Sequence, residues 1–161
     1  MKKLDLYRLK KGLESVGGLT GIKFAYTIAK NLRKVAAEVS ILDELLAPSE
    51  AFTKYEACHL ALCIEHSEKD EAGKPRGVNE PNGTFTFALA DRAAFEAAME
   101  EVRAVHEKAI EDRKDQVQRH KEFLREPAEI DLYLIDLDVI PEAITTEQMT
   151  AILEIVREEK Q

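Results

Sequence analysis

Residues 25–46 read AYTIAKNLRKVAAEVSILDELL, and this stretch decides the fold class. Its apolar residues recur at intervals of three and four for three heptads: Ala25, Ile28, Leu32, Val35, Val39, Leu42 and Leu46. Such spacing predicts a long α-helix with a narrow apolar stripe, which packs on another helix at a shallow angle. Lys23, Lys30 and Lys34 lie away from the stripe, as solvent-facing residues should.

Further helices are predicted on both sides of this one. Residues 4–16 carry apolar side chains at ragged helical spacing, and Gly17-Gly18 ends the pattern. Pro48 and Ser49 interrupt the long helix, because proline lacks a backbone donor and suits the first turn of a new helix. The next predicted helix, over 50–67, has a broad apolar face formed by Ala57, Cys58, Leu60, Ala61, Leu62 and Ile64.

The second half of the chain mixes loops, strands and helices. The polar stretch after residue 67 predicts a loop, and Thr84-Phe-Thr-Phe alternates like a short strand. Asp91 caps the longest helical pattern, which runs to about Arg125 and has the apolar stripe Phe95, Ala98, Val102, Val105 and Ala109. Residues 129–140 are rich in β-formers and predict a strand, and Thr145 or Thr146 caps a last helix.

These elements predict a mainly α protein, an antiparallel helical hairpin or small bundle of long helices with a short two-stranded β element. The two strands are expected to join residues 84–88 to part of 130–139. We expect one helical domain over residues 1–161, divided into a basic N-terminal segment 1–18, helices in 20–67, loop and strand 68–90, long helix 91–126, strand 129–140 and C-terminal helix 145–158.

Composition excludes several classes of protein. The chain has 161 residues, of which 45% are hydrophobic and 34% charged, so it is too apolar to be disordered throughout. No apolar run approaches the roughly 20 residues of a membrane span, and no secretory signal is recognisable, so we expect no membrane partner. Two cysteines form no disulfide framework, which favours a reducing cytoplasm.

The net charge of −8 is unevenly distributed along the sequence. Residues 1–35 have a balance of +7, and the remaining residues have a balance of −15. One interpretation is that the basic N-terminal region meets an anionic partner, with Lys10, Lys11, Lys23 and Lys30 as contacts. The other interpretation is that the basic end meets the acidic body of the same chain or of a neighbour.

Three side chains form the best candidate metal site. His59, Cys63 and His66 share one side of a helix at spacings of four and three. Zinc needs four ligands in a tetrahedral arrangement, and the chain has no second pair of ligands at a matching spacing. We therefore expect the cysteines to fill the core and the histidines to lie at its polar margin, with no metal or other cofactor bound.

Two other patterns suggest catalysis less specifically. Asp136 and Asp138 lie on one face of the predicted strand, with Asp131 nearby, as in some magnesium sites, but no matching motif accompanies them. Gly17-Gly-Leu-Thr-Gly21 precedes a helix, but it is neither a P-loop nor a dinucleotide-binding loop. We expect an acidic solvent-facing strand and a hinge between helices respectively, and no catalytic residue.

The order of short motifs resembles a family of small proteins of tailed bacteriophages and prophages, whose function is not established. The shared motifs are the helix Lys23–Lys30 (K-x-A-Y-x-x-A-K), the loop Asp70–Pro75, the helix Phe95–Glu101, the segment Glu129–Ile135 and the C-terminal helix Thr145–Glu158. This chain departs from the family by a longer helix over about 103–125. The resemblance implies a phage setting, in the host cytoplasm or the virion, and no particular chemistry.

Three functions remain open from the sequence. The first is a non-enzymatic phage protein that acts through protein–protein contacts, in virion assembly or as an accessory factor. The second is a modulator that binds a host protein, nucleic acid or small anionic ligand through the basic N-terminal region, and the third is a metal-dependent enzyme. The half-polar end of the long helix also predicts a homo-oligomer, with contacts at Val117, Phe123 and Leu124.

Overall fold

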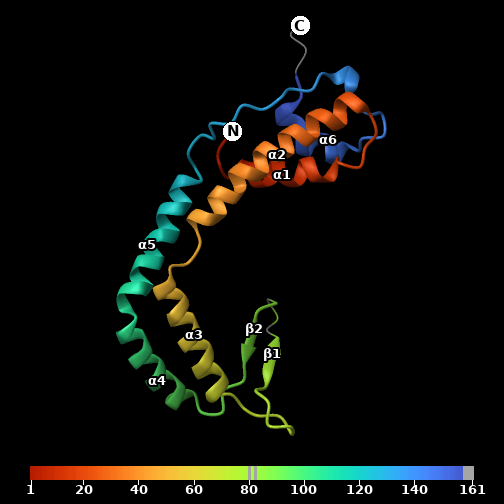
Figure 1. The fold of residues 1–161 in the computed structure, drawn as a ribbon. Coiled ribbons are helices and arrows are strands. Elements are labelled where there is room, and N and C mark those ends of the chain that lie inside the picture. The colour runs from red at the N-terminus through yellow and green to blue at the C-terminus, as the bar shows by residue number, and fades with distance from the viewer. Residues whose placement is uncertain (80, 82, 158–161) are drawn as a thin grey trace. The chain divides into compact units, whose positions relative to one another are not determined.

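A computed structural model describes residues 1–79, 81 and 83–157 of the chain. It confirms a mainly helical fold with one small antiparallel sheet of two strands (Figure 1). A single domain was expected, but the contacts divide the chain into two compact units. The first unit joins residues 1–47 to 118–161, and the second is Pro48–Val117. Within the described residues, no helix has both the length and the apolar character needed to cross a membrane.

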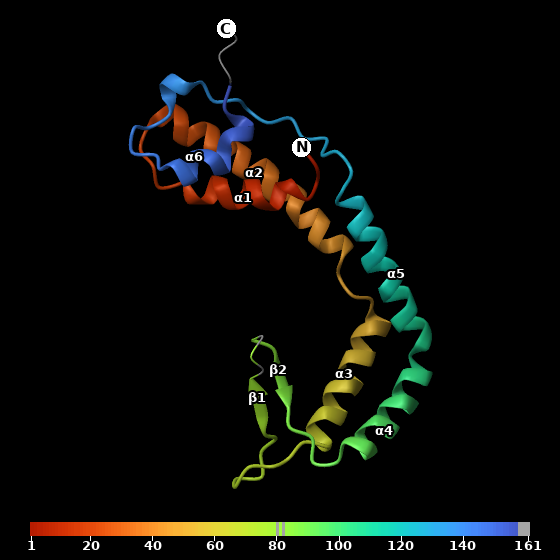
Figure 2. The same ribbon diagram turned by 180° about the vertical axis from the view of Figure 1, so that it is seen from behind.

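The first unit is built on three helices that lie side by side (Figures 1 and 2). They are α1 (Asp5–Ser15), α2 (Ile22–Leu45) and α6 (Thr146–Ile152). The connection between α1 and α2 is short, so the two form an antiparallel hairpin, and α6 packs on α1. Their buried side chains form one core, whose members are Leu6, Leu9, Leu13, Val16, Phe24, Ile28, Val35, Val39, Leu42, Ile135, Ile152 and Ile155.

The predicted apolar stripe of α2 is largely confirmed but is shifted at its start. Ile28, Val35, Val39 and Leu42 are buried, whereas Ala25 is exposed and Phe24 is buried in its place. The stripe also contains a polar residue, Asn31, which is fully buried. It packs on α1, while the helix that follows Asp91 packs elsewhere.

The predicted strand over 129–140 is wrong. This segment is extended but irregular: Ile135 makes one isolated parallel bridge to Val156, and Leu137–Val139 forms a 3₁₀ turn. Among the described residues no strand lies beside it to form a ladder, and the strand predicted at 84–88 pairs elsewhere. The C-terminal helix is also shorter than predicted, since α6 ends at Ile152, and the predicted end, Glu158, lies outside the described residues.

The second unit contains a helix pair and a β-hairpin. Helix α3 (Glu50–Glu65) packs on α4 (Arg92–Val105). The predicted cap Asp91 accepts a hydrogen bond from the first turn of α4, and Ser49 caps α3 in the same way. Strand β1 (Gly77–Asn79) pairs antiparallel with β2 (Phe85–Phe87). The ring of Phe85 lies over the space that a side chain on Gly77 would need. The strand at 84–88 therefore pairs with its neighbour in sequence, not with 130–139.

The long helix predicted over 91–126 is interrupted at His106. Helix α4 ends at Val105, and α5 (Glu107–Phe123) follows directly. His106 departs from helical geometry, with φ −107° and ψ 14°, and its ring lies 6.0 Å from that of Tyr55 on α3, centroid to centroid. Val105, which was expected on the apolar stripe, is exposed.

The close packing of α1 on α6 leads to a stability prediction. A Cβ atom at Gly12 would lie only 2.5 Å from the carbonyl oxygen of Ala151. We expect Gly12→Ala to lower the free energy of unfolding by about 1–3 kcal/mol in urea denaturation, despite the better helix propensity of alanine. Gly18→Ala is the control, because no atom lies within 4 Å of a Cβ there, and it should be neutral or slightly stabilising. Equal effects of the two substitutions would contradict this account of the packing.

The contact between α1 and the end of α2 leads to a titration prediction. Tyr7 Oη donates to Asp43 Oδ1 at 2.8 Å. Burial, and then the hydrogen bond and charge of Asp43, raise the pKa of Tyr7 to about 12. A raised pKa means that the neutral hydroxyl stabilises the fold below the ordinary tyrosine pKa of about 10, and that this stabilisation is lost as the pH rises towards the folded-state value. Ultraviolet titration should show one tyrosine ionising late, and Tyr7→Phe should remove that step.

Candidate functional site

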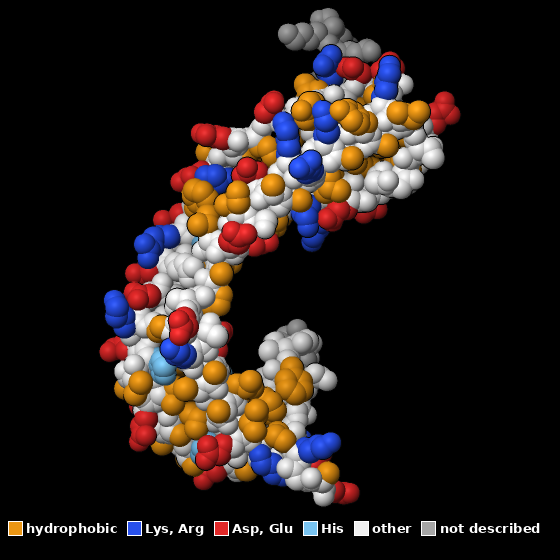
Figure 3. All heavy atoms as spheres, in the orientation of Figure 1, with side chains coloured by type: hydrophobic (Ala, Val, Ile, Leu, Met, Phe, Trp, Pro, Cys, Tyr) orange, Lys and Arg blue, Asp and Glu red, His pale blue; other side chains and the backbone are white. Residues whose placement is uncertain are grey.

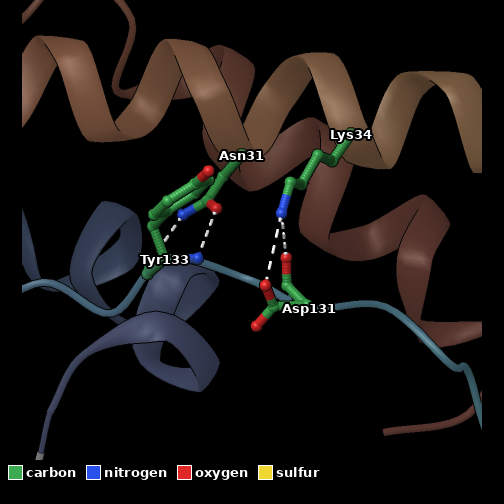
Figure 4. A network of polar contacts seen from close by, with 4 residues as sticks. All are labelled: Asn31, Lys34, Asp131 and Tyr133. Carbon is green, nitrogen blue, oxygen red and sulfur yellow. Dashed lines mark hydrogen bonds and ion pairs between the residues drawn. The ribbon is translucent and has the colours of Figure 1, made fainter.

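Asn31 holds an irregular segment of the chain against α2. Its Nδ2 donates to the carbonyl oxygen of Tyr133, and its Oδ1 accepts from the backbone N–H of the same residue, both at 2.8 Å (Figure 4). Asn31 has 0% of its surface exposed. One side-chain amide thus satisfies both backbone groups of Tyr133, as a neighbouring strand would. The position of Tyr133 along α2 is fixed by this pair of bonds.

A lysine one turn further along α2 makes a second link to the segment. Lys34 Nζ donates to the carbonyl oxygen of Asp131 at 2.6 Å and lies 3.6 Å from the Asp131 carboxylate (Figure 4). The same ammonium lies 4.5 Å from the ring centroid of Tyr133. These groups are solvent-exposed, so we expect the ion pair to add less than about 1 kcal/mol to stability.

Lys30 lies between two tyrosine rings. Its Nζ is 4.7 Å from the ring centroid of Tyr26 and 4.8 Å from that of Tyr133. The pKa of Lys30 is raised, mainly by its hydrogen bond with Tyr26, so the charged form is favoured. Cation–π contacts of this kind place the ammonium near the ring faces. The two rings and the lysine therefore form one arrangement, to which α2 contributes two residues.

We define the Tyr–Lys surface as Tyr26, Lys30, Lys34 and Tyr133. Both tyrosines are exposed, and Ile22 and Leu134, which adjoin this surface in the sequence, are 91% and 50% exposed. Figure 3 shows Lys and Arg side chains gathered over α2 among exposed apolar side chains. The surface offers aromatic and aliphatic groups for burial and fixed ammonium groups for an anionic partner.

Only part of the predicted basic contact region coincides with this surface. Lys30 belongs to it, and Lys23 precedes Tyr26 by one turn on α2 and is exposed. Lys10 and Lys11 lie on α1 instead. Lys10 Nζ is 3.3 Å from the carboxylate of Glu14, and Lys11 lines an open depression between α1 and α6.

Two of the three residues predicted to contact another subunit make contacts within the chain instead. Phe123 and Leu124 pack against the core of the first unit. The ring of Phe123 lies 3.4 Å from Lys3 Nζ, and the carbonyl of Leu124 accepts from the backbone N–H of Leu4 at 2.9 Å. Val117 is half-buried. Phe123 and Leu124 are therefore not free surface, and substituting them would disturb folding.

The predicted metal candidates form an aromatic contact between α3 and α4. The rings of His59 and His66 lie 6.3 and 6.0 Å from that of Phe95, and Cys63 Sγ lies 3.5 Å from His59 Nε2. Burial raises the pKa of the Cys63 thiol, which disfavours the thiolate that binds metals and attacks electrophiles. In the described part of the chain, no group of three or more His, Cys, Asp or Glu side chains could hold a metal ion.

Two of the three aspartates considered above form ion pairs within the chain. Asp131 lies beside Lys34, and Asp136 forms an ion pair with Arg157 at 3.1 Å. Asp138 lies in the 3₁₀ turn rather than on a strand face. Gly21 has a φ of 133° immediately before α2, a backbone conformation that favours glycine.

Sequence reasoning missed Asn31, Tyr26 and Tyr133 as residues of the candidate site. Asn31 gave a signal, because it is a polar residue within a run of buried apolar positions, and buried polar groups need partners. The partner was not identifiable, since Tyr133 lies about one hundred positions away in the sequence. Nothing in the sequence distinguished the two tyrosines from other residues on the solvent-facing sides of the predicted helix and strand.

The double hydrogen bond of Asn31 leads to a stability prediction. Asn31→Ala removes the fully buried amide and leaves the N–H and C=O of Tyr133 without the partners that it supplies. We therefore expect the free energy of unfolding to fall by about 2–4 kcal/mol. Lys34→Ala removes only exposed contacts to the same segment and should cost about 1 kcal/mol or less. Urea denaturation followed by circular dichroism measures both. An Asn31→Ala variant as stable as Lys34→Ala would contradict the role given to the amide.

Comparisons with known proteins add no further information about this site. No family model matches the chain, and neither a curated protein nor a solved structure matches it. A functional proposal therefore depends on the chemistry of the Tyr–Lys surface and on the phage-family resemblance of the sequence motifs.

Proposed function

We propose that this protein binds another protein through the Tyr–Lys surface and catalyses no reaction. The observation that supports this proposal is the double hydrogen bond between Asn31 and Tyr133. A buried amide is used to hold an exposed ring beside two lysines. An exposed aromatic ring that is already fixed loses little conformational entropy on binding, which favours affinity.

The side chains of the surface fit a protein partner. Tyrosines are enriched at the centres of protein interfaces, where they bury a large apolar area and keep a polar hydroxyl. The exposed Ile22 and Leu134 add aliphatic area that only an apolar surface would cover well. Because Lys23, Lys30 and Lys34 accompany these groups, the partner is expected to carry carboxylates around an apolar centre.

Nucleic acid or a small anionic ligand is the alternative partner. Alternating rings and lysines are the groups on which single-stranded nucleic acids stack and neutralise their phosphates. One observation favours a protein over these ligands. Ile22 and Leu134 are exposed and offer nothing to a phosphate backbone, whereas an apolar protein surface would cover them.

The resemblance of the sequence motifs supports a setting for this activity. We propose that the protein belongs to a tailed bacteriophage or prophage, and that its partner is a virion component or an accessory protein. The protein would then act in the host cytoplasm or within the virion.

Site-specific cross-linking tests the proposal. The full chain is made with a photoreactive phenylalanine analogue in place of Tyr26, and is irradiated in extract of the cells that produce it. We expect one major adduct that protease removes and nuclease does not. The same analogue in place of Leu153, which is exposed but outside the Tyr–Lys surface, should give no such adduct.

A charge reversal provides the second arm of this test. Lys30→Glu in the cross-linking protein should reduce the adduct at least tenfold, because it reverses the central charge of the surface. Lys121→Glu reverses an exposed charge on α5 and should leave the adduct unchanged. Adducts that nuclease removes would establish the nucleic-acid alternative, and equal adducts at both analogue positions would refute a specific surface.

A further inference from the structure

Helix α3 carries an apolar stripe that its own unit does not cover. None of the residues of α3 is fully buried, although the helix is rich in apolar side chains. One side faces α4, and the other side carries Ala57, Leu60, Ala61 and Ile64. Leu60 and Ile64 are 52% and 40% exposed, so this part of the predicted apolar face is open to solvent. Figure 3 shows apolar side chains exposed over the second unit.

We propose that a second copy of this chain covers the stripe, with α3 of one copy antiparallel to α3 of the other about a two-fold axis. The sizes of the side chains fit this arrangement. If the axis passes between residues 60 and 61, Ala57 of one copy faces Ile64 of the other, and Leu60 faces Ala61. Each large side chain then meets a small one, which allows two helices to approach closely.

The charges beside the stripe fit the same register. Lys54 and Glu65 lie on one flank of α3, near its opposite ends, and both are exposed. An antiparallel two-fold arrangement brings this flank against itself. Lys54 of one copy then lies two residues, or about 3 Å along the helix axis, from Glu65 of the other copy. The symmetry forms this ion pair twice.

The same charges favour this orientation over a parallel pair. A parallel two-fold pair would place the flank of Lys54 and Glu65 against the opposite flank of the other copy, so it would form neither of these ion pairs. In the single chain Lys54 pairs with Glu50 at 2.7 Å on the surface of α3. That exposed pair is weak, so Lys54 can exchange partners at little cost.

Self-complementarity is the reason to choose a second copy over an unrelated protein. When the stripe is reversed against a second copy, its small side chains meet large ones and its positive end meets the negative end. A two-fold interface requires this kind of self-complementarity. This inference uses residues of the second unit only, while the Tyr–Lys surface lies in the first. It therefore goes beyond the proposed function and can fail or succeed separately from it.

Sedimentation velocity of the full chain between about 1 and 200 µM tests the inference. We expect a monomer–dimer equilibrium. Lys54→Glu and Glu65→Lys should each weaken the dimer at least tenfold, because each places like charges together twice. The double variant Lys54→Glu with Glu65→Lys restores opposite charges and should dimerise within about threefold of wild type. Circular dichroism checks that each variant stays helical.

Apolar variants complete the experiment. Ile64→Ser should abolish the dimer, and Leu153→Ser, at an exposed leucine of the first unit, should not change it. A chain that remains monomeric at 200 µM would overturn the inference. So would an Ile64→Ser variant that dimerises as wild type does, or a double charge variant that fails to recover dimerisation. Lys30→Glu should dimerise as wild type does, which separates this result from a failure of the proposed function.

Discussion

The structure of the first unit depends on one buried side-chain amide. The segment after Pro127 crosses α2 without a neighbouring strand, so its backbone N–H and C=O groups need partners from elsewhere. Asn31 supplies both partners at Tyr133 from the middle of an otherwise apolar stripe. The next residues on the exposed side of α2 are lysines, one position before and three after Asn31. The bond that stabilises the segment thus also brings the Tyr133 ring to the lysines.

Local signals in the sequence predicted the elements well. Asp91 was predicted as a helix cap, as was Thr145 with Thr146 as an alternative, and both Asp91 and Thr145 accept a hydrogen bond from the first turn of their helix. These contacts involve residues three positions apart, so short-range chemistry determines them. Partner choice was predicted poorly. The strand at Phe85–Phe87 pairs with Gly77–Asn79, because closing a short loop costs less entropy than joining segments fifty residues apart.

Periodicity also could not say whether an apolar face is buried within the chain. The stripe of α2 and the face of α3 look alike as patterns, yet Ile28 and Val35 are buried while Leu60 and Ile64 are exposed. A helical repeat indicates that one face of the helix is apolar, but it does not indicate whether the same chain or another molecule covers that face. The candidate site was hidden for a related reason. Its lysines were visible, but the tyrosine that organises them comes from a distant segment.

The two proposed surfaces would reinforce each other. A contact centred on two tyrosines and two lysines is small, and a single copy would bind a partner weakly. Pairing through α3 would place two Tyr–Lys surfaces in one particle, so binding of the first would raise the effective concentration of the second. This gain needs no new contact at α2, and it is greatest for a partner that presents repeated copies of its own surface. A repetitive assembly such as a virion is therefore the kind of target that suits a dimer with one weak site on each chain.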